Sequence, residues 1–411
     1  MNYPFRPTES SVNNRRTREG QVTPLKRKEV SVNKFRWGIL GAGFAARKFV
    51  HGLRAAPDAE AVLVASRSPD KAREFARQLR IPRAAGSYAE AIQDGEKVDA
   101  FYLATPSNTH REYALQCLHA GRPILVEKPF ALNATEAREI VEAARARAVF
   151  CMEAMWTRFL PLVRDVKRLI EQGALGDIRM FTGSFGTAET VRPDSKLFDA
   201  RARGGATLDR GVYPISLAFH FLGVPDEISS KAIIGETGVD EDIAAVFRYD
   251  RGTLALINAS LRTQALNECV IMGTRAQVRI HAPIYRPFRM TVTPVQDLAR
   301  SGETRNRFEV FRESHWVHSA YQRFNGMAST ILGRNPKQRT GYYAGNGYHY
   351  EAEEVMSCVR EGRHESRVMP LTQSLQIMQA VDHIRSRSVD CLGMSKHWAA
   401  VGVSQPTLDQ L

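Results

Sequence analysis

The stretch FRWGILGAGFAA, residues 35–46, decides the fold of this protein. An apolar strand runs into a turn with two glycines, and a helix starts at about Ala45. Gly41 allows the tight turn, Gly43 lets a pyrophosphate approach the backbone, and Ala46 is small enough for close packing of helix on strand. The N–H groups at the start of the helix attract phosphate. The stretch predicts a dinucleotide-binding turn with these cofactor contacts: Gly41, Gly43, Phe44, Ala45 and Ala46.

The residues that follow repeat the same strand-then-helix order. Apolar stretches alternate with amphipathic ones, which indicates a parallel sheet covered on both faces by helices. The expected strands are 61–66, 98–105 and 122–128, and the expected helices are 71–80, 110–121 and 134–148. We therefore predict a Rossmann-type, doubly wound α/β domain over residues 34–157.

Beyond Met152 the pattern changes. A helix is expected over 161–173, followed by strand-like stretches with no helix between them at 178–186, 244–250, 252–262 and 276–283. Successive strands without crossovers indicate an antiparallel sheet. Two closing helices are expected at 349–362 and 371–386. We predict an α+β domain over 158–411 with a large, mainly antiparallel open sheet and a polar insertion at about 297–345.

Charge and cysteine content restrict the class of protein. The net charge of +13 is concentrated in residues 1–34, at +5, and in 297–345, at +4. We interpret residues 1–33 as a basic arm that is disordered or wraps a partner, and a nucleic-acid groove is disfavoured. The five cysteines form no CxxC pair, so neither disulfides nor a metal site is expected. No apolar run approaches the roughly 20 residues of a membrane span. A cytoplasmic location is predicted.

The end of the second strand bears on the choice between NAD and NADP. The sequence there is Ala65-Ser66-Arg67-Ser68, followed by Lys71, and it contains no acidic residue to bind a ribose 2′-hydroxyl. Ser66 can donate to phosphate oxygens, and Arg67 can pair with their charge. This favours NADP, bound with the help of Ser66, Arg67 and Lys71. The alternative is that Arg67 and Lys71 are ordinary solvated residues at a helix start.

Two further motifs carry candidate catalytic groups. Glu127-Lys128-Pro129 ends the fourth expected strand, where the carboxyl ends of a parallel sheet border the ligand crevice. Far along the chain, the segment GGATLDRGVY, residues 204–213, places Asp209 and Tyr213 four residues apart. They share one face if the segment is helical, and that face could meet Lys128 across a cleft.

The GAGFAA turn, the EKP motif and the GGxxxDxGxY segment together resemble the Gfo/Idh/MocA oxidoreductase family, over about residues 35–390. The stretch MEAMWTRFLP at 152–161 and the tyrosine of DRGVY resemble its dihydrodiol dehydrogenase and NADP-dependent D-xylose dehydrogenase branch. The resemblance implies that Tyr213 is the general acid/base, with Lys128 beside it and Asp209 orienting the substrate. An adjacent ammonium is expected to bring the pKa of the phenol towards the working range.

The resemblance also implies contacts around the reacting groups. It places the following residues near the cofactor: Thr105, Pro106, Asn108, His110, Glu127 and Lys128. Trp156 and Phe185 match apolar substrate-pocket positions, together with Asp209 and Tyr213. His110 could instead cap the helix that follows it, and Trp156 and Phe185 could be core residues. Tyr285 and Phe288 are further aromatic candidates that the sequence cannot place.

These observations predict a soluble NADP-dependent enzyme that transfers hydride to or from a sugar or vicinal-diol hydroxyl carbon. Two alternatives stay open. One is a cofactor-sensing regulatory protein of the same fold, and the other is an enzyme like glucose–fructose oxidoreductase with tightly bound NADP. A homodimer or higher oligomer built through the C-terminal sheet is also expected.

Overall fold

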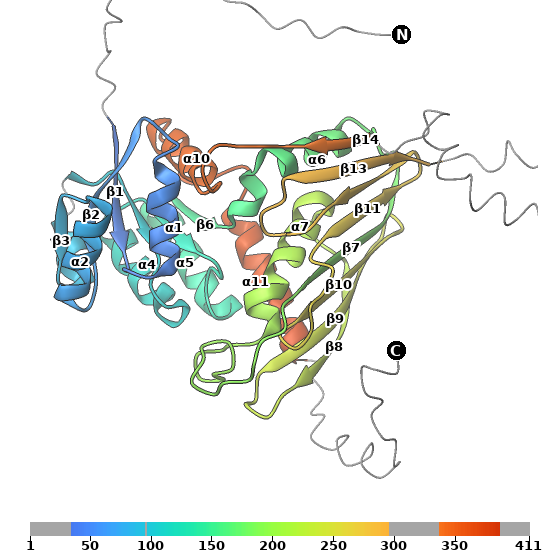
Figure 1. The fold of residues 1–411 in the computed structure, drawn as a ribbon, viewed down its shortest axis with the longest axis horizontal. Coiled ribbons are helices and arrows are strands. Elements are labelled where there is room, and N and C mark those ends of the chain that lie inside the picture. The colour runs from blue at the N-terminus through green and yellow to red at the C-terminus, as the bar shows by residue number, and fades with distance from the viewer. Residues whose placement is uncertain (1–33, 95–96, 296–336, 387–411) are drawn as a thin grey trace, which may run out of the picture. The chain divides into compact units, whose positions relative to one another are not determined.

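Strand β1 (Phe35–Leu40) lies inside a six-stranded parallel sheet with the order β3-β2-β1-β4-β5-β6. The computed structural model describes residues 34–94, 97–295 and 337–386, which Figure 1 shows in colour. The other strands of this sheet are β2 (Ala59–Ala65), β3 (Arg83–Ala85), β4 (Ala100–Leu103), β5 (Ile124–Glu127) and β6 (Cys151–Ala154). Strands β4 and β5 are buried on both sides, as expected for a sheet covered by helices. The predicted doubly wound fold is confirmed.

The helices of the first part are α1 (Phe44–Leu53), α2 (Pro69–Leu79), α3 (Tyr88–Gln93), α4 (His110–His119) and α5 (Ala134–Arg147), with the 3₁₀ turn η2 (Ser107–Thr109) before α4. Side-chain caps stand at the start of α2, α3 and α5. The side chains of Ser68, Ser87 and Asn133 each accept an N–H three residues further on. Such caps satisfy N–H groups that have no partner within the helix.

The second sheet has eight strands in the order β14-β13-β12-β11-β7-β10-β9-β8. Its strands are β7 (Ile178–Gly186), β8 (Glu227–Ile234), β9 (Asp240–Tyr249), β10 (Thr253–Ser260), β11 (Cys269–Gly273), β12 (Ala276–Ile280), β13 (Arg289–Pro294) and β14 (Lys337–Thr340). Only the β7–β10 pair is parallel, and the other pairs are antiparallel. The predicted α+β class with a mainly antiparallel sheet is confirmed.

The helices of the second part pack on one face of this sheet and on the first sheet. They are α6 (Pro161–Glu171), α7 (Val212–Leu222), α10 (His349–Arg360) and α11 (Leu371–Ser386), with the short turns η3 (Trp156–Phe159) and η4 (Thr207–Gly211). Helix α11 contacts α5 and β6 as well as α7 and β8, and α10 contacts α1 (Figure 1). The two closing helices therefore connect the parallel sheet to the antiparallel one.

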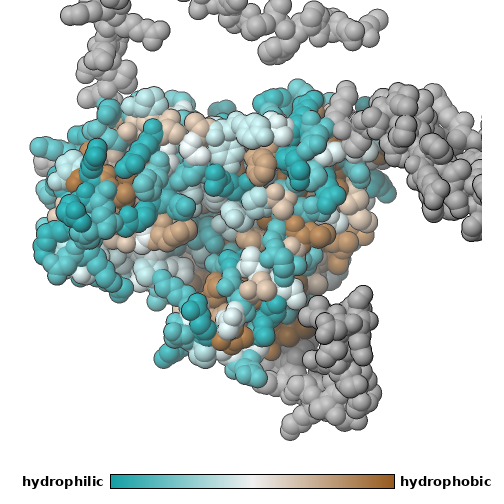
Figure 2. Space-filling view, viewed as in Figure 1, coloured by the Kyte–Doolittle hydropathy of each residue, from teal (hydrophilic) through white to brown (hydrophobic). Residues whose placement is uncertain are grey.

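The other face of the second sheet carries apolar side chains that no helix of the described ranges covers. Burial alternates strictly along β10, and the outward residues Leu254 and Leu256 are 40% and 39% exposed, with Val246 of β9 at 38%. Apolar surface, brown in Figure 2, is seen in this part of the molecule. An exposed apolar row on a sheet face is typical of an association surface.

The structure alters one sequence-based boundary. Residues 337–340 of the expected insertion form the edge strand β14, whose Arg339 pairs with Met290 of β13. An edge strand is hydrogen-bonded on one side only and needs little apolar content, so the polar sequence KQRT gave no strand signal. Two predicted segments lie outside the described residues. They are the arm 1–33 and the rest of the insertion up to residue 336. The expected boundary between 157 and 158 falls within η3.

In the described part of the chain, no helix combines the length and apolar character of a membrane span.

Candidate active site

The glycine turn after β1 has the geometry that its sequence predicts. Gly41 has a φ of +115°, and a Cβ at this position would stand 2.4 Å from the carbonyl oxygen of Ala104. A Cβ on Gly43, the N-cap of α1, would meet nothing within 4 Å. Ala46 is fully buried, whereas the Phe44 side chain is 77% exposed. Gly41 therefore serves the turn itself, and the space in front of Gly43 is free for a ligand.

The residues at the end of β2 differ in whether they cap the local turn or line the cavity. The Ser66 hydroxyl accepts the N–H of Ser68 at 3.3 Å, and the Ser68 hydroxyl accepts the N–H of Lys71 at 3.4 Å. Arg67 is exposed and lines a cavity that continues to Lys128. Ser66 and Lys71 are at the same strand end but do not line this cavity. Arg67 is thus the cation of this group that is best placed to reach a ligand.

The loop between β4 and α4 borders the same cavity with Thr105, Pro106 and Asn108. His110 follows it and is 1% exposed, with Nδ1 at 2.9 Å from the carbonyl oxygen of Pro129 and Nε2 at 3.0 Å from that of Thr105. Burial lowers the pKa of His110. The imidazole therefore connects the Thr105 loop to the loop that carries Lys128, so it positions the two loops.

Lys128 stands where the two sheets meet. It follows β5, and its Nζ lies 3.2 Å from the backbone oxygen of Asp209, 3.4 Å from Asp209 Oδ1 and 4.9 Å from the centre of the Tyr213 ring. Asp209 is in the π turn η4, and Tyr213 is in the first turn of α7. The structure thus brings the three expected catalytic residues together, although 81 residues separate Lys128 from Asp209.

The electrostatics of this triad differ from the expectation in one respect. Burial raises the pKa of Tyr213 above its usual value of 10, while the Lys128 ammonium and a hydrogen bond with Trp156 lower it only in part. The expectation that Lys128 brings this pKa towards neutrality was wrong, because the desolvation of a phenol that is 7% exposed outweighs one nearby cation. Tyr213 is therefore a neutral phenol near pH 7.

Lys128 and Asp209 stabilise each other's charge. Burial disfavours the ammonium, but Asp209, Tyr213 and Glu127 together outweigh the effect of burial, so the pKa of Lys128 rises. Burial likewise disfavours the Asp209 carboxylate, yet Lys128 and Arg210 lower the pKa of this group. Arg210 forms an ion pair with Asp209 and a second one with Glu189 at 2.9 Å. Arg210 was missed in the sequence, although its charge next to Asp209 in the motif was a usable signal.

An aromatic group stands beside Tyr213. Phe185 meets the Tyr213 ring edge-on at 5.4 Å and stacks on Tyr285 at 5.5 Å, and Trp156 stacks on Tyr348 at 4.5 Å. Trp156, Phe185 and Tyr285 thus lie next to Tyr213, and the role of Trp156 and Phe185 in binding substrate stays a prediction. Phe288 does not belong to this group and is 42% exposed. No sequence signal pointed to Tyr348, which precedes α10.

A buried acidic cluster supports the site from behind. The Tyr102 hydroxyl donates to Glu127, and burial raises the pKa of Glu127. Glu351 of α10 is fully buried, neither carboxyl oxygen has a hydrogen-bond partner among the described residues, and burial raises its pKa strongly. Both carboxyls are therefore more easily kept protonated than exposed ones. Glu127 also lines the cavity, and its contact with the cofactor stays a prediction.

The cavity has a volume of about 450 Å³ and is bounded by both halves of the chain. From the first half come Ala45 at the start of α1, Arg67, the Thr105–His110 loop and the Glu127–Pro129 loop; from the second come the segment before η4, Leu208 and Asp209. Open space at Gly43, a helix N-terminus and a cation at the β2 end fit a nicotinamide dinucleotide laid along the strand ends. The residues that would hold it are those of the Gly41–Ala46 turn, Arg67 and the two loops.

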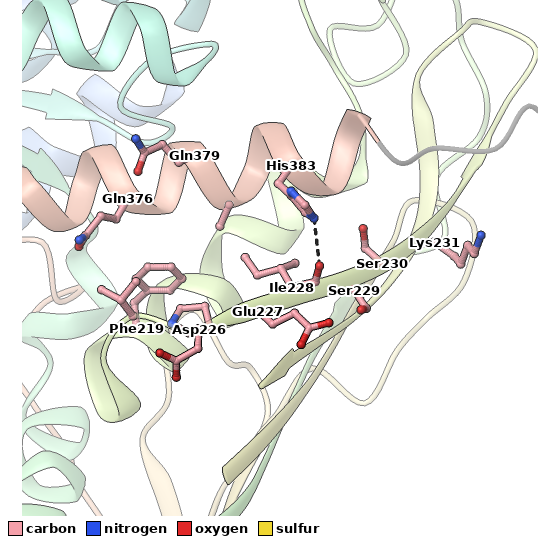
Figure 3. A pocket seen from close by; sticks show the side chains of 13 residues that line it. Phe219, Asp226, Glu227, Ile228, Ser229, Ser230, Lys231, Gln376, Gln379 and His383 are labelled. Carbon is pink, nitrogen blue, oxygen red and sulfur yellow. Dashed lines mark hydrogen bonds between the residues drawn. The ribbon is translucent and has the colours of Figure 1, made fainter. Parts of the chain in front are cut away.

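A larger hollow of about 800 Å³ lies between β8 and α11 and shares no lining residue with this cavity. Figure 3 shows His383 pointing from α11 to the backbone of β8, where its Nε2 is 3.0 Å from the Ile228 oxygen. The triad is not part of this hollow, so we assign the site to the smaller cavity. Within the described ranges, no group of three or more His, Cys, Asp or Glu side chains could hold a metal ion.

Two family models match the chain. Residues 35–155 match the oxidoreductase family with an NAD-binding Rossmann fold, and residues 163–279 match the GFO/IDH/MocA C-terminal domain. Trans-1,2-dihydrobenzene-1,2-diol dehydrogenase of Bos taurus is 31% identical over 366 residues, which are 88% of this chain and 99% of the relative. The human enzyme of the same name is 32% identical over 354 residues, or 85% of this chain and 96% of the relative.

Solved structures show the same fold. A 3-ketoreductase from Actinomadura kijaniata, in complex with NADP and TDP-benzene, has a TM-score of 0.69 at 23% identity and covers 87% of this chain and 99% of its own. A levoglucosan dehydrogenase in complex with NADH and levoglucosan has a TM-score of 0.71 at 19% identity. The match covers 86% of this chain and 96% of the levoglucosan dehydrogenase chain. The predicted resemblance and the prediction of an oxidoreductase are confirmed by the family models and the curated relatives. The chain belongs to the Gfo/Idh/MocA family of oxidoreductases.

Proposed function

We propose that this protein is an NADP-dependent oxidoreductase acting on the hydroxyl carbon of a vicinal diol or sugar, with Tyr213 as the acid/base. The observation that carries the proposal is the position of Lys128. Its ammonium lies between the Asp209 carboxylate, at 3.4 Å, and the Tyr213 ring, at 4.9 Å, on the wall of the cavity that also contains Ala45 and Arg67. A cation, an acid and a phenol next to a dinucleotide turn are suited to moving a hydroxyl proton during hydride transfer.

The cofactor supplies the hydride acceptor or donor, and the chain handles the proton. In the direction of reduction, the neutral Tyr213 phenol donates its proton to the oxygen of a bound carbonyl. Lys128 and the Trp156 hydrogen bond then stabilise the phenolate that is left. In the direction of oxidation, Tyr213 must first lose its proton before it can accept one from the alcohol. Asp209 keeps Lys128 charged throughout.

The preference for NADP rests on the end of β2. Arg67 lines the cavity and is exposed, and the three residues that follow β2, Ser66, Arg67 and Ser68, include no acid that would repel a 2′-phosphate. The Actinomadura kijaniata 3-ketoreductase of the same fold was solved with NADP. A single guanidinium is therefore proposed to recognise the 2′-phosphate, while Ser66 and Ser68 shape the turn around it.

The substrate class is proposed from the side chains next to Tyr213. The aromatic group of Trp156, Phe185, Tyr285 and Tyr348 offers flat apolar faces, and Asp209 and Arg210 offer polar partners for hydroxyls. A cyclic diol has one flat apolar face and two vicinal hydroxyls, and a pyranose has similar features. The curated relatives are named for a trans-1,2-dihydrobenzene-1,2-diol, which agrees with this class.

The test is an activity panel with purified protein, NADP, a set of trans-dihydrodiols and a set of aldoses. We expect NADPH to form with at least one of them. Lys128→Met and Tyr213→Phe should each lower kcat/KM by about 10²–10⁴-fold, the usual contribution of acid–base catalysis. The controls are Lys231→Met on β8 and Tyr342→Phe, which is 83% exposed. Full activity of Tyr213→Phe would show that another group moves the proton.

A further inference from the structure

One wall of the dinucleotide cavity comes from the second half of the chain. The segment between β7 and η4, residues 187–206, lines the same cavity as Arg67 and the Thr105 loop. Its residues that line the cavity are Lys196, Leu197, Asp199, Ala202, Arg203 and Gly204. Of these, only Gly204 belongs to a sequence motif, and none is part of the triad. The cavity is therefore lined by both halves of the chain, and the second half also contributes cations.

This segment is built to hold one conformation. The Phe198 ring is 1% exposed, and the N–H of Gly204 donates to the Asp199 oxygen at 3.0 Å. A Cβ on Gly204 would lie 2.4 Å from the carbonyl oxygens of Lys196 and Leu197, so the two ends of the turn are in close contact. The buried Phe198 ring and the closed turn hold the segment in one conformation. A ligand that binds to it therefore does not have to supply the free energy that ordering the segment costs.

The C-terminal end of the segment is tied to the body of the protein. Arg385 of α11 donates to the backbone oxygens of Arg203 and Gly204, at 3.4 and 3.2 Å. The buried Asp240 carboxylate accepts the Thr207 N–H at 2.6 Å and pairs with Arg385 at 3.5 Å. Arg203 itself has a φ of +53°, which non-glycine residues rarely adopt. These bonds keep Arg203 at the cavity in spite of that backbone strain.

The cations of this region differ in their partners. Arg201 pairs with Asp199 at 3.5 Å, and Arg210 pairs with Asp209 and Glu189. Within the part of the chain that the structure describes, the side chains of Lys196 and Arg203 form no ion pair. Two positive charges that line the cavity and lack a carboxylate partner are suited to bind an anion.

We propose that residues 187–206 form a cofactor clamp in which Lys196 and Arg203 bind phosphate groups of the dinucleotide. The proposal rests on the proposed function, because it takes NADP as the ligand. Asp199 lines the same wall, but its charge is balanced by Arg201, so it does not repel the phosphates strongly. The clamp would connect cofactor binding to the second half of the chain, which also carries Tyr213.

The test is direct binding of NADPH and NADH, measured by fluorescence titration without substrate. The variants are Lys196→Ala and Arg203→Gln, with Arg203→Lys as the charge-preserving variant. Arg192→Ala is the matched control, since Arg192 is an exposed cation of the same segment that does not line the cavity. We expect Kd for NADPH to rise about tenfold in each charge-removing variant, as for loss of one charge-assisted contact. Arg203→Lys and Arg192→Ala should bind like the wild type.

A comparison of NADPH with NADH shows which phosphate group the clamp contacts, because only NADPH carries the 2′-phosphate. Weaker binding of both NADPH and NADH supports contacts to the pyrophosphate, and weaker binding of NADPH alone supports contacts to the 2′-phosphate. Unchanged Kd values for Lys196→Ala and Arg203→Gln would overturn the clamp while leaving the proposed function intact. A wild-type protein that binds neither dinucleotide would overturn the proposed function itself. Lys196 is exposed, so its variant keeps the test valid if Arg203→Gln is unstable.

Discussion

At the scale of single residues, the proposed acid/base Tyr213 is a buried phenol. Its ring packs against Phe185, and its exposed fraction is 7%. A buried phenol is hard to ionise, because the phenolate loses its water shell. Lys128 offsets a part of that cost and cannot offset all of it, so the pKa of Tyr213 stays above its usual value. In the proposed reaction, Tyr213 is therefore well suited to donate a proton and poorly suited to accept one.

This has a consequence for the pH dependence of the two directions. Below its pKa, the phenolate fraction of Tyr213 rises about tenfold per pH unit, so kcat/KM for oxidation should rise by that slope between about pH 7 and pH 9. Reduction uses the protonated phenol, which dominates over the same interval, so its kcat/KM should stay nearly flat. Steady-state rates in both directions would check this. An oxidation rate that levels off near pH 7 would mean that the acting base has a much lower pKa.

At the scale of elements, the β1–α1 turn contains two glycines with different physical reasons to be there. Gly41 needs a positive φ and has a carbonyl oxygen where a Cβ would be, whereas Gly43 has an ordinary φ of −98° and open space in front of it. The first glycine is required by the fold. The second leaves room for the ligand.

The two glycines should therefore respond differently to the same substitution. Gly41→Ala should lower the free energy of unfolding by about 2 kcal/mol, because the backbone must shift and take up strain. Gly43→Ala should leave this free energy nearly unchanged and weaken NADPH binding by about tenfold or more, because the Cβ would occupy ligand space. Urea unfolding and fluorescence titration measure the two effects. Equal loss of stability in both variants would contradict the assignment.

The end of β2 gives a second prediction at this scale. Arg67→Ala should raise Kd for NADPH about tenfold and leave Kd for NADH unchanged, because only NADPH carries the 2′-phosphate. Arg73→Ala is the control, since Arg73 is an exposed residue of α2 that pairs with Asp70 at 2.6 Å. If Arg67→Ala weakens both cofactors equally, the guanidinium acts on a group that they share.

At the scale of the whole molecule, the outer face of the second sheet has a row of apolar side chains across four strands. Val246 lies opposite Leu256, Leu254 lies beside Met180, and Met180 lies opposite Met272. These side chains are partly exposed, and none of the described helices covers them. A stable interface buries about 800 Å² per partner, which a sheet of eight strands can supply. We propose that this face joins two copies of the chain.

The proposed dimer is tested by a charge in the middle of the row. Leu254→Glu should give a monomer, because a carboxylate buried between two copies costs several kcal/mol without a partner. Gln93→Glu at the exposed end of α3, in the parallel-sheet part of the molecule, adds the same charge outside the row and should leave the dimer intact. Sedimentation velocity gives the mass in solution. A wild-type protein that sediments as a monomer would rule out this interface.

Much of the architecture is visible in the sequence because local patterns report local burial. The alternation of apolar strands and amphipathic helices predicted the parallel sheet, and the Gly41–Ala46 turn predicted where a dinucleotide would lie. The edge strand β14 escaped prediction, since its sequence KQRT is polar and carries no apolar period. The motifs around Lys128 and Tyr213 named the candidate catalytic groups in advance.

The tertiary structure decided how these groups meet and what they can do. Lys128 and Asp209 are distant in sequence, and their 3.4 Å contact depends on how two sheets pack together. The same packing buries Tyr213, brings Tyr348 and Tyr285 beside it and places residues 187–206 on the cavity. Desolvation and charge depend on every neighbouring group in space, so the raised pKa of Tyr213 could not be derived from the residues next to it in the chain.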